Sequence, residues 1–131
     1  MTRPDRVLGS YWTLAVGADP TGDKLCLHDF RIRVEAAAKA GFTAMGFWHT
    51  DLLANRKKMG FREMKRILDG NGIGEIEVEW LLDWFCTDSR RAVSDETRSL
   101  LLDAAEKLGA MHIKIGDLGN DCALHPRVLV E

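Results

Sequence analysis

Two glutamates in an alternating stretch are the clearest chemical signal in this sequence. Glu77 and Glu79 alternate with Ile76 and Val78, and alternation with a period of two predicts a β-strand that carries both carboxylates on one face. Because an unpaired buried charge is costly, these carboxylates need water, a cation or a polar cavity beside them. We therefore predict a strand with one face for packing and the other for chemistry, and Trp80, which shares the parity of Ile76 and Val78, is predicted to pack in the core.

A second alternating stretch, residues 111–115, carries positive charge. His112 and Lys114 share one face of this predicted strand, and the apolar residues around them share the other. If the two strands are neighbours, Glu79 and Lys114 lie on the same inner face. Such a pair fits acid–base chemistry, but an ion pair that neutralises a half-buried polar face is the commoner arrangement.

Helical segments followed by glycines separate the predicted strands. Apolar residues at helical spacing predict three helices, each closed by a glycine that can adopt a left-handed conformation. The predicted helices are residues 30–40, 61–69 and 94–108, and their closing glycines are Gly41, Gly72 and Gly109. The predicted strands are residues 7–16, 42–49, 73–82 and 111–115, and the predicted loops are residues 17–29, 50–60 and 85–93.

Strands that alternate with helices indicate an α/β fold with right-handed crossovers and a parallel sheet. A doubly wound open sheet would bury its strands on both faces and would show continuous apolar runs, which these strands lack. A (β/α)8 barrel with a polar interior explains the polar faces, although a complete barrel needs roughly 250 residues. We predict a single domain over residues 1–131 that forms a partial (β/α)8 barrel of about four parallel strands with three helices on one side. Residues 118–131 are predicted to be an irregular tail.

Composition and charge indicate the cellular compartment of the protein and exclude some classes of partner. The chain has 131 residues, of which 46% are hydrophobic and 29% charged, with a formal net charge of −2. We therefore expect one globular domain and neither a nucleic-acid nor a membrane partner. Cys26, Cys86 and Cys122 are an odd number without close pairing, which fits a reducing compartment. With no predicted signal peptide or spanning segment, we expect a cytoplasmic protein.

Three motifs together resemble a known family of barrels. They are Ala-Ala-Lys-Ala-Gly-Phe at residues 37–42, Gly-Ile and Val-Glu-Trp within residues 72–80, and Ala-Glu-Lys-Leu-Gly-Ala at residues 105–110 with Gly-Asp at 116–117. This pattern, over about residues 7–117, resembles the N-terminal half of the sugar phosphate isomerases and epimerases. These are the xylose isomerase-like barrels, which are related to endonuclease IV and to inosose dehydratases.

The resemblance implies an enzyme that moves a proton beside a carbonyl on a sugar or polyol. A divalent metal (Mn, Mg, Zn or Co) would polarise the substrate oxygens in the complete family fold. The metal ligands of the family are acidic residues and a His on later strands, so we expect this chain alone to bind no metal. Family members often carry Glu on the second strand, where this sequence has Gly46.

In such barrels the active site lies at the carboxyl ends of the strands. We predict Glu79 and Lys114 as catalytic residues, with Glu79 accepting a proton or a sugar hydroxyl and Lys114 holding an anionic substrate oxygen. Trp48, His49 and Asp117 are the predicted substrate-binding residues. Tryptophans are more often packing residues, and a single His without a second ligand nearby does not predict a metal site.

Two other functions remain open at this point. The chain could be a truncated, non-catalytic barrel fragment or an assembly subunit, or an endonuclease IV-like phosphodiester hydrolase. The net charge of −2 and the lack of a basic groove argue against the hydrolase. Four strands would leave unpaired edges at the first and last strands, and such edges allow homo-oligomer formation.

Overall fold

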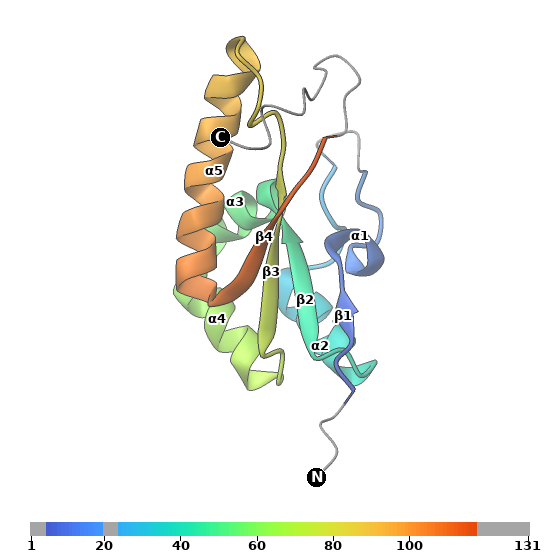
Figure 1. Ribbon diagram of the computed structural model, residues 1–131. Coiled ribbons are helices and arrows are strands. Elements are labelled where there is room, and N and C mark those ends of the chain that lie inside the picture. The colour runs from blue at the N-terminus through green and yellow to red at the C-terminus, as the bar shows by residue number, and fades with distance from the viewer. Residues whose placement is uncertain (1–4, 20–23, 118–131) are drawn as a thin grey trace.

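A parallel sheet in the order β1-β2-β3-β4 forms the centre of the protein (Figure 1). The computed structural model describes residues 5–19 and 24–117. Within them the strands are β1 (Leu8–Gly9), β2 (Ala44–Trp48), β3 (Glu75–Leu81) and β4 (Ala110–Ile115). The helices are α1 (Tyr11–Leu14), α2 (Phe30–Lys39), α3 (His49–Lys58), α4 (Phe61–Gly70) and α5 (Ser89–Leu108). The predicted α/β class and the four parallel strands are confirmed, whereas the tail at residues 118–131 lies outside the described residues.

The apolar face of the sheet forms the main core. Met45 and Phe47 of β2 and Ile76 and Val78 of β3 are each at most 1% exposed, and they pack with buried residues of α2, α3, α4 and α5. Figure 1 shows α3, α4 and α5 along one side of the sheet and α1 beside β1 on the other. Because side chains alternate along a strand, Glu77 and the residues in step with it point to the opposite face.

The described residues form five helices rather than the predicted three. The predicted strand over residues 7–16 is wrong beyond Gly9, where the chain turns at Ser10 and forms α1. Tyr11 is 1% exposed and packs with Trp48 of β2. Burial of these aromatic rings against the sheet therefore outweighs the β-propensity of the segment.

The predicted loop over residues 50–60 is also wrong, because α3 begins directly after β2. The buried side of α3 is largely polar: Asp51 accepts a hydrogen bond from the Arg33 guanidinium of α2 at 2.7 Å, and both side chains are almost fully buried. Asn55 donates to the Asp51 carbonyl at 2.8 Å. A helix whose buried side is polar gives no apolar period, so the pattern used to find the other helices does not detect it.

The predicted loop over residues 85–93 ends earlier than expected, because α5 begins at Ser89. Its N-cap is Asp88, whose carboxylate accepts the backbone N–H of Arg90 at 2.9 Å. Ser94, the predicted first residue of this helix, instead lies within α5. Its side chain is buried and donates a hydrogen bond to the Leu82 carbonyl at 2.5 Å. Gly109 ends α5 with a φ of 70°, as predicted. Among the described residues, no helix is long and apolar enough to cross a membrane.

Candidate functional site

The polar face of the sheet brings the charged side chains of β3 and β4 together. The two strands are parallel neighbours, so residues at matched positions stand side by side. The register pairs Gly46 with Glu77, Trp48 with Glu79, Glu77 with His112 and Glu79 with Lys114. Glu79 and Lys114 therefore share one face of adjacent strands, as the sequence predicts.

Glu77 is the ionised centre of this cluster. Its Oε1 accepts a hydrogen bond from Lys114 Nζ at 2.6 Å, and its Oε2 lies 2.7 Å from His112 Nε2. Burial favours the neutral acid, but hydrogen bonds with Glu79, Lys114 and His112 outweigh burial and lower the pKa of Glu77 below its usual value. Sequence reasoning did not select Glu77 or His112 as site residues, although their matching parity was available as a signal.

Glu79 has the opposite character. It is fully buried, its Oε1 accepts the backbone N–H of Tyr11 at 3.2 Å, and its Oε2 accepts no hydrogen bond from the residues that the structure describes. Burial and the hydrogen bond with Glu77 raise the pKa of Glu79 to about 7, while the Tyr11 N–H and the Lys114 charge oppose the rise. A carboxyl group that titrates near neutral pH can both take and release a proton, as a general acid or base must.

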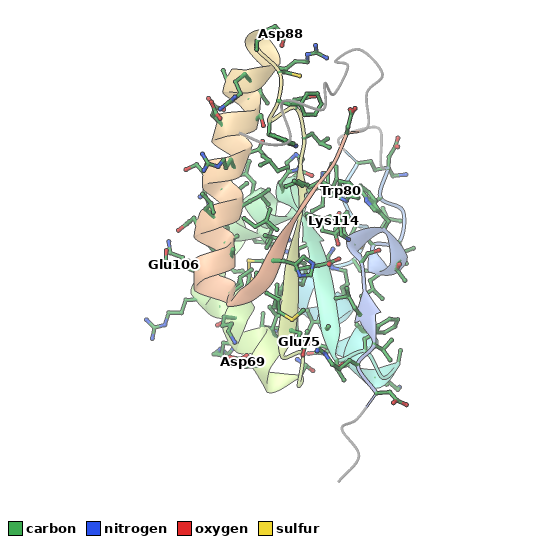
Figure 2. The ribbon with its side chains drawn as sticks, viewed as in Figure 1. Asp69, Glu75, Trp80, Asp88, Glu106 and Lys114 are labelled. Carbon is green, nitrogen blue, oxygen red and sulfur yellow. The ribbon has the colours of Figure 1, made fainter. Side chains whose placement is uncertain are left out.

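Lys114 supplies the positive charge between the two carboxylates. Its Nζ lies 3.5 Å from Glu79 Oε1, farther than from Glu77. Burial opposes its charge, but the hydrogen bond to Glu77 and the neighbouring carboxylates outweigh burial and raise the pKa of Lys114. Figure 2 shows Lys114 beside Trp80, whose ring centroid is 5.7 Å from the ammonium. The closest charge partner of Lys114 is therefore Glu77, not Glu79 as the sequence suggested.

Aromatic rings line the polar face next to Glu79. Trp48 is 8% exposed, and its ring centroid lies 4.8 Å from that of Trp12. Trp80 packs with the same group, although its parity with Ile76 and Val78 predicted a place in the main core. That prediction is wrong because the register shifts between Glu79 and Leu81, so that Leu81 joins the main core instead.

His49 and Asp117 have different positions relative to the cluster. The His49 ring stacks on Trp48 at 4.5 Å, and its buried Nδ1 has no hydrogen-bond partner within the described ranges. Burial lowers the pKa of His49, and a hydrogen bond with the Trp80 backbone only partly opposes this shift. The structure thus places Trp48 next to Glu79 in the strand register, whereas the neutral His49 contacts Trp48 and the Trp80 backbone. Asp117 follows the end of β4 and is exposed, unlike the buried Glu77 and Glu79.

The described residues do not fit a divalent metal. Across residues 5–19 and 24–117, no group of three or more His, Cys, Asp or Glu side chains could hold a metal ion. The position between Glu77 and Glu79 is taken by the Lys114 ammonium. A metal at this position would compete with a fixed positive charge only a few ångströms away, which is unfavourable.

Access to Glu79 requires a side chain to move. Four surface cavities of about 310 to 440 Å³ are lined by other residues. The side chain of Lys114 is 30% exposed, and that of His112 is 50% exposed. Among the described residues, the partly exposed Lys114 lies 3.5 Å from the fully buried Glu79 Oε1, so a ligand reaches Glu79 only after side chains such as Lys114 move.

Gly46 allows the two carboxylates to approach β2. A Cβ atom at this position would overlap Glu79 Oε1 and would lie 2.9 Å from Glu77 Oε1. We predict that Gly46→Ala lowers the free energy of unfolding by about 1–3 kcal/mol, because the buried carboxylates must shift. Urea unfolding measures this change. In the matched control, Gly74→Ala, the added Cβ meets no atom within 4 Å; equal losses in both variants would contradict the prediction.

The raised pKa of Glu79 predicts a pH-dependent stability. The native state keeps the Glu79 proton up to about pH 7, whereas the unfolded chain releases it near the ordinary value of 4.5. The unfolded state therefore binds fewer protons between these values, and the Glu79 contribution to stability falls as pH rises. Glu79→Gln removes this dependence, so its free energy of unfolding relative to the native chain should rise by about 3 kcal/mol between pH 4 and pH 8. Urea unfolding across this range checks it, and a constant difference would show that Glu79 titrates normally.

Comparison of the sequence with protein-family models finds no family that matches, and comparison with curated proteins finds no match either. The function of this cluster must therefore be inferred from its geometry and from the resemblance of its motifs.

Proposed function

We propose that the chain is a sugar or sugar phosphate isomerase/epimerase-like protein that transfers a proton next to a carbonyl group. The observation that carries this proposal is the buried Glu79 carboxyl, whose pKa is raised to about 7, beside the Lys114 ammonium. A base that is half ionised near neutral pH and a cation within reach are the two groups that this chemistry requires.

Each residue has a defined role in the proposed reaction. The Glu79 carboxylate removes the proton from the carbon next to the substrate carbonyl. The electron pair of that C–H bond forms a C=C bond, and the π pair of the carbonyl moves to its oxygen. Lys114 stabilises the negative charge that develops on this oxygen. In isomerisation, the hydroxyl proton of the carbon that lost its C–H proton moves to the old carbonyl oxygen, and Glu79 returns its proton to the former carbonyl carbon. In epimerisation, a second group protonates the opposite face of the original carbon. Trp48 and Trp80 offer apolar surfaces on which the C–H face of a sugar can stack.

The different burial of Lys114 and Glu79 determines which of the two groups a substrate meets first. Lys114 has a long flexible side chain that is partly exposed, whereas Glu79 is fully buried. We infer that an anionic or carbonyl oxygen of the substrate draws the ammonium away from Glu77 and uncovers Glu79. In the free protein, Lys114 covers Glu79, so the base is shielded from water until a substrate binds.

The proposed architecture is part of a (β/α)8 barrel in which the polar face of the sheet lines the interior. The parallel order of β1 to β4 and the outer position of α2, α4 and α5 support this arrangement. Any divalent metal that assists the reaction would need ligands from outside the described residues, and none of the roles above passes through it.

Solvent deuterium exchange tests the proposed reaction. We expect the protein to introduce deuterium beside the carbonyl of at least one member of a panel of ketoses, aldoses and their phosphates in D₂O, with and without Mn²⁺ or Mg²⁺. Mass spectrometry or proton NMR measures the exchange. Glu79→Gln should lower the rate at least about 100-fold, whereas Glu75→Gln should not, because Glu75 pairs with Arg6 at the start of β3. An unchanged rate in Glu79→Gln, or no exchange into any sugar, would reject the proposal.

A second candidate function is that of an assembly subunit whose two sheet edges pair with a second copy. Val7 and Leu8 beside the β1 edge are each 42% exposed, and Met111 and Ile115 on β4 are 46% and 54% exposed. Parallel pairing of β4 with β1 of another copy would satisfy the backbone groups of both edges and cover these apolar side chains. Two such contacts around a two-fold axis would also enclose the polar face.

Native mass spectrometry tests this association. We expect a dimer at micromolar concentration, and Ile115→Lys should shift it to monomer because a charge would be buried at the edge contact. The matched control is Leu102→Lys, since Leu102 is 49% exposed but lies on α5 and not on an edge strand. A monomeric native chain, or equal effects of the two substitutions, would argue against edge pairing.

A further inference from the structure

A buried base needs a route for its proton, and the polar face contains a chain of groups that reaches water. Glu79 is 0% exposed and Glu77 is 2% exposed, whereas the His112 side chain is 50% exposed. These three groups lie on two adjacent strands, and the register places Glu77 directly beside His112. Exposure thus increases step by step from the buried carboxyl to the imidazole.

We propose that Glu77 and His112 form a proton path that connects Glu79 to solvent, with His112 as its solvent-facing end. Glu79 Oε1 and Glu77 Oε1 both face the space beside Gly46, and Lys114 Nζ lies 3.5 Å from the first oxygen and 2.6 Å from the second. Two carboxyls this close favour a state in which one of them carries a proton. Glu77 Oε2 is 2.7 Å from His112 Nε2, a distance suited to proton transfer. The catalytic consequence of the path rests on the proposed function, but the path itself is a property of the free protein.

The transfer balances without an added reactant. Glu79 gives its proton to Glu77 Oε1, and the Glu77 carboxyl group turns about its Cγ–Cδ bond so that this proton faces His112. The imidazole accepts the proton on Nε2 from the tautomer that carries its own proton on Nδ1. The imidazolium then loses the proton on Nδ1 to water, which leaves neutral His112 and an ionised Glu79. Uptake of a proton by Glu79 follows the same steps in reverse. His112 and Glu77 are therefore positioning and relay residues, because neither needs to touch the substrate.

Lys114 balances the charge of the two carboxyls and orients Glu77 toward His112. Its ammonium donates to Glu77 Oε1 at 2.6 Å and so leaves Oε2 to face His112. With one proton shared by the two carboxyls, the pair carries a single negative charge, and Lys114 balances it. The other group that faces Glu79 among the described residues is the Tyr11 backbone N–H, which does not titrate. A proton that enters or leaves the carboxyl pair therefore changes the charge of the cluster by one unit.

Carbon-13 relaxation dispersion on the free protein tests the path. In protein labelled at the glutamate carboxyl carbons, we measure the rate at which Glu79 exchanges between its acid and carboxylate forms, at the titration midpoint of each variant. His112→Ala should lower this rate at least tenfold, and added imidazole should restore it by occupying the vacated position. His112→Gln should also slow exchange but should not respond to imidazole, since its side chain fills the space without carrying a proton.

The matched control is His28→Ala, because His28 is exposed and precedes α2, outside the cluster. It should leave the exchange rate of Glu79 unchanged. An unchanged rate in both His112 variants, or equal slowing in His28→Ala, would overturn the path. No substrate enters this experiment, so slow exchange in His112→Ala together with no sugar deuteration would reject the enzyme and keep the path, whereas the reverse result would reject only the path.

Discussion

The polar face depends on one electrostatic requirement: two carboxylates on a buried strand must share a single positive charge. Lys114 meets this requirement from the neighbouring strand at 2.6 Å from Glu77 and 3.5 Å from Glu79. One ammonium cannot neutralise two full negative charges, so one carboxyl retains its proton. Gly46 provides the space for the pair, and the Tyr11 N–H of α1 provides the last hydrogen bond to it.

This division of charge separates an ion-paired carboxylate, Glu77, from a buried carboxyl with a raised pKa, Glu79. A purely structural pair would lower the pKa of each carboxyl, and Glu77 behaves in this way. Glu79 does not, because burial and its acidic neighbour raise its pKa. An ion pair therefore accounts for Glu77 and Lys114 but leaves Glu79 unexplained. Proteins retain such destabilising groups most often where chemistry needs them, which is why the proposed function centres on Glu79.

The sequence predicted what periodicity determines and missed what tertiary contacts determine. Alternation in β3 and β4 correctly placed Glu79 and Lys114 on one face, and Gly109 correctly marked the end of α5. The helix α3 was missed because its buried side chains, such as Asp51, are polar and find their partner on another helix. Trp80 was misplaced because a register shift inside β3 breaks the alternation, and no local pattern in the sequence reports such a shift.

The buried pair of Arg33 and Asp51 limits how the chain can be divided. The Arg33 guanidinium lies within 6 Å of the Tyr11, Phe30 and Phe47 rings while it binds Asp51, so it joins α2 to segments on both sides of it in the sequence. A helix–strand unit is usually the natural module of exchange in α/β proteins. In this protein, Arg33 of α2 and Asp51 of α3 form a buried charge pair across two such units. A chimera that replaces α2 alone would therefore leave Asp51 as a buried carboxylate without its counterion. Recombination should therefore succeed only when α1, α2, β2 and α3 are moved together.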